Sequence, residues 1–383
     1  MMRDTISFSS VSPPPKSRPA SPAPLAVTAL LAFLCFVGWS TAWPTAVLVH
    51  LVLAVGALPL ILASMGYFTP VLTRSGAVPG RVNLLPLLAM AAGGLGSMAV
   101  AGPFWLVGVA APLAWLVAAA LLWWMSRRAA RALGSPHPGL LWYQAALVCL
   151  LLGLSAILAT LVWPEQWGLL RTLHRHLNLL GLVGLTAIGT LQVLLPTVGG
   201  YPDPQAGARL HQDLKYALAG VLLMTAGTVL GSWLGWLGLG AWTWVLGRLL
   251  RPLSGQVGRL WQANGAALSL LAALGGFVLS LLSITWGEGS VALPLFLALF
   301  LFPLVAGALA HLLPLWWWPG LPTPQRHTAQ QQLGRWALLR VGLSWLGGGA
   351  LLAGAEWGVY PVATPMLLLL GQVVWLGRQR GNV

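Results

Sequence analysis

Long apolar runs recur along the whole chain and constrain its fold more than any other feature. Each run holds roughly 20 residues, enough for a helix to cross the ~30 Å hydrocarbon core of a bilayer. Charged residues make up only 7% of the 383 residues, and the mean hydropathy is +0.82. A water-soluble domain needs more charge than this to cover its surface. The sequence therefore predicts an all-α, polytopic membrane protein whose main partner is the lipid bilayer.

We predict twelve transmembrane helices from these runs. They cover roughly residues 24–42, 45–68, 84–101, 104–126, 139–163, 173–197, 214–233, 235–250, 260–283, 291–315, 335–354 and 357–377. The span at 235–250 is the weakest, because it is short and rich in glycine. Residues 1–23 are rich in proline and serine, so we expect a disordered cytoplasmic tail ahead of a single membrane domain at 24–383.

Basic residues indicate the orientation of the chain. An even number of spans places both termini on the same side of the membrane. If that side is the cytoplasm, every Lys and Arg except Arg171 and Arg175 falls there, as the positive-inside rule requires. We therefore predict a protein of the bacterial inner membrane with both termini in the cytoplasm. The net charge of +14 then comes from basic residues that orient the chain in the membrane. We therefore expect no nucleic-acid partner.

A short pattern repeats in three of the predicted spans. GTLQVLLP (189–196) matches GALAHLLP (307–314), and MGYFTP (65–70) is a looser copy. The copies lie in spans two, six and ten, which are four spans apart, so the sequence predicts three arcs of four helices. His50 lies 20 residues before Pro70, and His176 lies 20 residues before Pro196. The matching position in the third copy is proline.

Three histidines fall in the outer third of the predicted membrane domain, namely His50, His174 and His176. An ionisable side chain at membrane depth suggests function, and imidazole is a common ligand to metals and to haem iron. Residues two apart on a helix point ~200° apart, so His174 and His176 cannot bind one metal from one helix face. They could serve two sites. His50 and His176, equivalent in the repeat, could reach one iron from opposite sides.

Each of these residues also has an ordinary explanation. A histidine can simply bond to a neighbouring carbonyl or lie in interfacial water. Arg171 and Arg175 could pair with haem propionates, because guanidinium binds carboxylate in a two-pronged geometry, or they could lie among lipid headgroups. Asn178 could hydrogen-bond within the same cluster.

The remaining candidate ligands have simpler explanations. His137, His211 and His327 are predicted in inner loops, and His311 near the inner end of span ten, beside three tryptophans. Cys35 and Cys149 fall in unrelated apolar helices and suit small buried hydrophobic residues rather than a disulfide.

The two helices that carry the outer histidines resemble a known family. HRHLNLLGLVGLTAIGTLQVLLP resembles the His-x-His helix of the catalytic subunit of haem-copper oxidases, especially the cbb3-type and nitric oxide reductase branch. HLVLAVGALPLILASMGYFTPVLTRSG resembles helix two of the same superfamily, which ligates a haem. Twelve spans in three arcs is also that fold. The resemblance implies that His50 and one histidine of the pair ligate a low-spin b-type haem. Repeat spacing favours His176 for this role, with His174 facing a second haem.

The sequence also departs from the oxidases. The His-x-His pair belongs to span ten in that family and to span six here. No His-x-x-x-Tyr and no His-His pair supplies copper ligands, and Glu165, Glu288 and Glu356 all fall in outer loops. We therefore do not expect oxygen reduction of the oxidase type. The pattern of spans and outer histidines that is left after these departures looks more like that of the NnrS-type membrane proteins. These are haem- and copper-associated relatives linked to nitric oxide tolerance.

The sequence thus favours a membrane-embedded haem protein with an electron-transfer role or a role related to nitric oxide or oxygen. It would hold one or two b haems through His50, His174 and His176. The sequence does not decide whether copper also binds. The redox partner, a cytochrome c or a quinol, and any catalytic turnover are also left open. The alternative is a transporter or carrier of a metal, haem or small solute, and a third is a scaffold subunit without a site.

Overall fold

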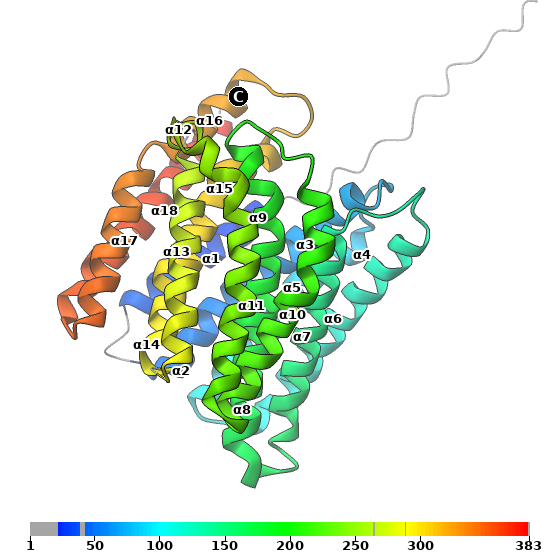
Figure 1. The fold of residues 1–383 in the computed structure, drawn as a ribbon, viewed down its shortest axis with the longest axis vertical. Helices are drawn as coiled ribbons and strands as arrows, with labels where there is room; N and C mark the ends of the chain where they lie inside the picture. The colour runs from blue at the N-terminus through cyan, green and yellow to red at the C-terminus, as the bar shows by residue number, and fades with distance from the viewer. Residues whose placement is uncertain (1–21, 39–42, 263–264, 288, 382–383) are drawn as a thin grey trace, which may run out of the picture.

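The computed structural model of the protein describes residues 22–38, 43–262, 265–287 and 289–381. All but the last two residues of the predicted N-terminal tail therefore lie outside the described chain. Helices make up nearly all of the described residues, and these contain no strand (Figure 1). Nine helical segments among them are long and apolar enough to cross a membrane. The described chain is therefore a polytopic α-helical membrane protein, as the sequence predicts.

Each of the twelve predicted spans forms a helix. In chain order the helices are α1 (Ala23–Gly38), α2 (Thr45–His50) with α3 (Leu58–Leu72), α4 (Gly80–Asn83) with α5 (Leu85–Ala101), α6 (Val107–Ala130), α7 (Gly139–Ala159), α8 (Trp167–His176) with α9 (Leu185–Val198), α10 (Ala206–Leu230), α11 (Ser232–Leu250), α13 (Ala266–Thr285), α14 (Gly289–Leu295) with α15 (Phe302–Trp317), α17 (Ala337–Leu352) and α18 (Val359–Gly381). Two short helices, α12 (Val257–Gln262) and α16 (Pro324–Gly334), connect spans.

Three of the twelve helices fall outside the nine candidate spans. Helices α1 and α17 have 16 residues each, fewer than the ~20 that cross a bilayer without tilt or thinning. Helix α11 has 19 residues, but glycine and tryptophan replace many aliphatic side chains in it. This agrees with the prediction that 235–250 is the weakest span.

Spans two, six and ten each contain a π-helical segment. These segments are Leu51–Ala57, Leu177–Gly184 and Phe296–Leu301, and each joins two α-helices of one continuous span. Each begins 18 or 19 residues before the proline near the end of its span, Pro70, Pro196 or Pro314. Segments of π-helix are rare and are frequently found at functional sites. The repeat seen in the sequence thus coincides with an irregularity of the backbone.

Helix contacts follow the same period of four spans. The three π segments pack between the first and third helices of their own group, against α1 and α5, α7 and α10, and α13 and α17. The third and fourth helices of each group pack as α5 on α6, α10 on α11, and α17 on α18. Helices α3, α9 and α15 reach the first helix of the next group, α7, α13 and α1, and α18 packs on α1. One contact pattern therefore recurs three times around the bundle.

Glycines permit the close approach of the first two helices in each group. A Cβ on Gly276 of α13 would overlap the carbonyl oxygen of Leu299 in the third π segment. In the second group, a Cβ on Gly181 would lie 2.5 Å from the Cβ of Cys149 on α7. In the first, a Cβ on Gly56 would lie 3.1 Å from the Cα of Ala29. The π segments are held tightly by their neighbours, and Cys149 packs as the sequence suggests.

The two ends of the bundle differ in the elements that form them. Helices α2, α8 and α14 lie at one end, and α12, α16 and the C-terminus lie at the other (Figure 1). The first end carries Arg171 and Arg175 on α8. It is also the end at which the three outer histidines lie.

Candidate histidine site at the end of the bundle

The structure brings two of the three predicted ligands together. His50 is the last residue of α2, and His174 lies in the last turn of α8. Their imidazole rings are nearly parallel, at an interplanar angle of 9°, and the ring centres are 6.4 Å apart. Two residues that are far apart in sequence therefore face each other across the interface between spans two and six.

Backbone carbonyls fix the tautomer of both rings. The Nδ1 atom of His50 lies 2.7 Å from the carbonyl oxygen of Ala46, and Nδ1 of His174 lies 2.9 Å from that of Gly153. A carbonyl oxygen can only accept, so each Nδ1 must donate its proton. In the neutral ring Nε2 then carries the free lone pair. Metal-binding histidines in proteins usually have this second hydrogen bond to a carbonyl or carboxylate.

Helix α7 orients the ring of His174, and Asn178 lies beside it and bonds the backbone of His174. The side-chain amide of Asn178 donates to the carbonyl oxygen of His174 at 2.6 Å, and its Nδ2 lies 3.3 Å from Nδ1 of the ring. Gly153 supplies the acceptor, and a Cβ at that position would lie 2.8 Å from Nδ2 of Asn178. The absence of a side chain at residue 153 thus lets α7 approach closely enough to orient the imidazole. The expected role of Asn178 in the cluster is confirmed.

His176 shares its local geometry with His50 but does not share the ring contact. It is the last residue before the second π segment, as His50 is before the first, and only 2% of its surface is exposed. Its Nδ1 lies 3.0 Å from the carbonyl oxygen of Thr172, four residues earlier, which is the arrangement of His50 and Ala46. The equivalence inferred from spacing therefore extends to the side chain. The structure nevertheless places His174, and not His176, beside His50.

Arg171 and Arg175 lie on α8 with the histidines, and both are exposed. Neither guanidinium forms a hydrogen bond or ion pair with a described residue. Their positions are compatible with either sequence interpretation, a negatively charged group bound nearby or lipid headgroups.

The remaining histidines are not part of this cluster. His327 lies exposed on α16, in the connection between two spans, whereas His211 lies exposed on α10 inside a candidate span, so the prediction of His211 as a loop residue is wrong. His137 lies in the connection between α6 and α7 and accepts a hydrogen bond at Nδ1 from the backbone N–H of Gly139. His311, on α15, has its carbonyl oxygen bonded by Gln330 of α16. Among the described residues, no group of three or more His, Cys, Asp or Glu could hold a metal ion.

Sequence reasoning missed a buried carboxylate. Asp213 lies in α10, inside one of the nine candidate spans, and is fully buried. It pairs with Arg248 of α11 across 2.7 Å. The predicted start of this span at residue 214 excluded Asp213 by a single position. Because the partner is a cation on a neighbouring helix, the pair cross-links α10 and α11 and is not a free proton carrier.

The chain matches no protein-family model, and no curated protein is similar to it. The histidine site is therefore interpreted from its own chemistry.

Proposed function

We propose that the protein is a membrane-embedded b-type cytochrome in which His50 and His174 are the axial ligands of one haem. The observation that carries this proposal is the separation of the two rings. Two rings that hold one metal ion through Nε2, with metal–nitrogen bonds of about 2.0–2.1 Å, would have their centres roughly 6 Å apart. The rings of His50 and His174 have 6.4 Å between centres. This pair replaces the pair of His50 and His176 that the repeat spacing favours.

The ligand set suits haem better than a bare ion. A structural zinc ion takes four protein ligands, and a catalytic one takes three. The described residues offer no group of that size. Haem iron receives four nitrogens from its own porphyrin and needs only axial ligands from the protein. Two imidazoles with free Nε2 atoms meet that need. The described residues contain no cluster of ligands that would hold a copper ion in addition to haem. The proposal is therefore limited to haem.

Two axial histidines favour electron transfer as the role of this haem. When bound, such a group would supply one-electron redox chemistry. Ala46 and Gly153 hold the ring protons on Nδ1 and keep both Nε2 atoms available. Arg171 and Arg175 would balance propionate charge at the same end of the bundle.

A second haem would use His176. Its Nδ1 bond to Thr172 leaves Nε2 free, as in His50. A haem held by His176 alone would supply the chemistry of diatomic gas binding, which would connect the protein to nitric oxide or oxygen. The recurring helix contacts support a fold like that of the haem-copper oxidase catalytic subunit. Charge segregation supports an inner-membrane location with cytoplasmic termini.

A reduced-minus-oxidised absorption spectrum of the purified full-length protein tests the proposal, together with haem quantification per chain. We expect b-type bands and one haem, or two if His176 also binds. A preparation without such bands from a host supplied with ample haem overturns the proposal. The transporter alternative predicts solute uptake into proteoliposomes that persists when His50 and His174 are both replaced by alanine.

A further inference from the structure

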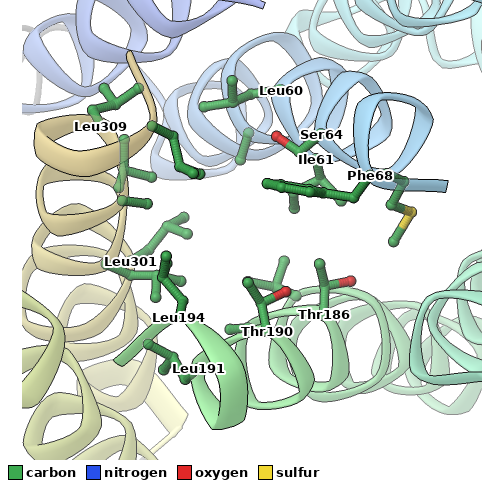
Figure 2. Close-up of a pocket in the computed structure, with 18 of the residues that line it drawn as sticks. Leu60, Ile61, Ser64, Phe68, Thr186, Thr190, Leu191, Leu194, Leu301 and Leu309 are labelled. Atoms are coloured by element: carbon green, nitrogen blue, oxygen red, sulfur yellow. The ribbon is translucent and has the colours of Figure 1, made fainter. Parts of the chain in front are cut away.

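A cavity lies among the three helices that follow the π segments. Figure 2 shows the space bordered by α3, α9 and α15, with Leu60 and Leu309 among the side chains around it. Its volume is about 110 Å³. Ala57, Val183 and Leu301, which lie at or next to the last residue of each π segment, all line it. The three outer histidines do not, so the cavity is separate from the candidate histidine site.

The lining uses the same positions in all three spans. Eighteen of its twenty residues lie 13, 10, 9, 6, 5 or 2 residues before Pro70, Pro196 or Pro314, with six in each span. Such spacing places the six residues on one face of each α-helix. Each group of four helices therefore contributes the same face, and the cavity lies on the axis that relates the three groups.

Small side chains at one of these positions create the space. The residues six positions before the three prolines are all small: Ser64, Thr190 and Ala308. The residues four positions further along are all large: Phe68, Leu194 and Leu312. Protein interiors are normally close-packed. A level at which all three helices carry a small side chain leaves room that the rest of the lining does not fill.

The lining offers little to a polar ligand, because no charged residue borders the cavity. The hydroxyl of Tyr143 lies 3.2 Å from Oγ1 of Thr190, so these two groups satisfy each other. Oγ1 of Thr186 and Nε1 of Trp316 are buried beneath neighbouring atoms and do not reach the space. Among the described residues of the lining, this leaves the hydroxyl of Ser64, and an ordered water needs two to four partners. An ion would lose its hydration without compensation.

We propose that this cavity binds a small apolar gas molecule. An apolar cavity of about 150 Å³ takes up xenon or benzene, which has six heavy atoms. The volume here is about 110 Å³, which by the same proportion suits a ligand of up to about four heavy atoms. Apolar gases also concentrate in the hydrocarbon core of a bilayer, where these helices lie. The inference rests on the cavity alone and is independent of haem binding.

Xenon is the probe that tests binding. Ile61 lines the cavity, whereas Ile188 on α9 is fully buried and does not line it. The full-length protein, labelled with ¹³C in the δ1 methyl groups of isoleucine, would be titrated with xenon pressure in detergent micelles and followed by NMR. We expect a saturable shift of the Ile61 methyl signal and none of the Ile188 signal. An Ile61 shift that is absent, that rises linearly with pressure or that equals the Ile188 shift overturns the proposal.

A substitution that fills the cavity tests the place of binding. Ala308→Leu adds three carbon atoms from α15 and should abolish the saturable shift of Ile61. Ala120→Leu is the matched control, because Ala120 is exposed on α6 and does not line the cavity, and it should leave the shift unchanged. Xenon saturation of Ile61 that is the same in Ala308→Leu as in the unaltered protein contradicts the assignment.

A second substitution tests the size limit and does not depend on the folding of Ala308→Leu. Leu309→Ala removes three carbon atoms from the lining, so the enlarged cavity should accept benzene. We expect benzene to cause a saturable shift of Ile61 in Leu309→Ala and none in the unaltered protein. Benzene saturation in the unaltered protein, or its absence in Leu309→Ala, contradicts a cavity of gas size. None of these signals comes from haem, so the result is separate from that of the absorption spectrum.

Discussion

The imidazole rings of His50 and His174 stand nearly parallel, 6.4 Å apart between centres, although the residues belong to different groups of four helices. Each ring is held through Nδ1 by a backbone carbonyl, so both Nε2 atoms retain a lone pair. One carbonyl is on the same helix as its histidine and the other is on α7. The orientation of His174 thus depends on a third helix, which makes it sensitive to changes well outside the ligands themselves.

Alanine substitutions of the three histidines should therefore have different spectra. His50→Ala or His174→Ala each removes one axial ligand, so we expect loss of the low-spin b-type signal. His176→Ala should keep that signal, because His176 makes no ring contact with His50. Loss of the low-spin signal in His176→Ala, with its retention in His174→Ala, would restore the pair that repeat spacing favours.

Substitution of Gly153 should disturb the site without touching a ligand. A Cβ at residue 153 meets Nδ2 of Asn178 at 2.8 Å, and a valine adds two further methyl groups. We expect Gly153→Val to displace α7 or Asn178, weaken the hold on His174 and lower haem content per chain. Gly96→Val on α5 is the control, because nothing lies within 4 Å of its Cβ position. Equal haem content in both variants would show that the Gly153 carbonyl does not position His174.

Much of the framework was predictable, because membrane helices are specified by long apolar runs. All twelve predicted spans are helical. The spacing of His50 to Pro70 and of His176 to Pro196 correctly indicated equivalent positions, since both rings bond the carbonyl four residues earlier. Such features depend on local sequence and on helix period.

Features set by helix rotation and by contacts between distant segments were not predictable. Spacing shows that His174 and His176 diverge, but it cannot say which of them faces span two. Gly153 gives no signal in the sequence, because its function is to present a carbonyl to a distant residue. The same holds for the cavity, whose lining reads as ordinary apolar helix. The repeat marks the three spans that contain π segments, but nothing in the sequence indicates the change of helix type within them.

Gly276 should be intolerant of a side chain. A Cβ there would overlap the carbonyl oxygen of Leu299, so α13 and the third π segment would have to separate. We expect Gly276→Val to abolish the monodisperse peak of the protein in size-exclusion chromatography. Gly371→Val on α18 has open space at its Cβ and should elute normally. A normal profile for Gly276→Val would mean that this contact is looser than the structure shows.

The stability of the connection between α6 and α7 should depend on pH through His137. Partial burial lowers the pKa of His137 below its ordinary value of 6.5, and the neutral ring accepts the Gly139 N–H. Its contribution is therefore complete above pH 6.5 and is lost as pH falls toward the lowered pKa. We expect His137→Asn, which keeps an acceptor that does not titrate, to flatten the fall in melting temperature between about pH 7.5 and 5.5. If the melting temperature falls equally steeply with pH in His137→Asn and in the exposed control His327→Asn, His137 does not cause the pH dependence.

Gln372 should stabilise the bundle by satisfying a buried cation. Arg340 of α17 is 1% exposed and donates to Oε1 of Gln372 on α18 at 2.6 Å and to the carbonyl oxygen of Leu333 at 2.7 Å. Gln372→Leu removes one acceptor from a buried guanidinium, which we expect to cost about 1.5–3 kcal/mol in the free energy of unfolding. The measurement is denaturant unfolding of the purified protein in detergent micelles.

Two further variants separate the loss of this bond from a general effect of the substitution. Gln144→Leu removes an exposed bond to Ser126 and should change stability little, because water replaces the lost partner. Arg340→Met combined with Gln372→Leu should recover part of the loss, since no buried charge then lacks its acceptor and apolar side chains fill a similar volume. If the double variant is less stable than Gln372→Leu alone, the guanidinium stabilises α17 through its bond to Leu333 and not through Gln372.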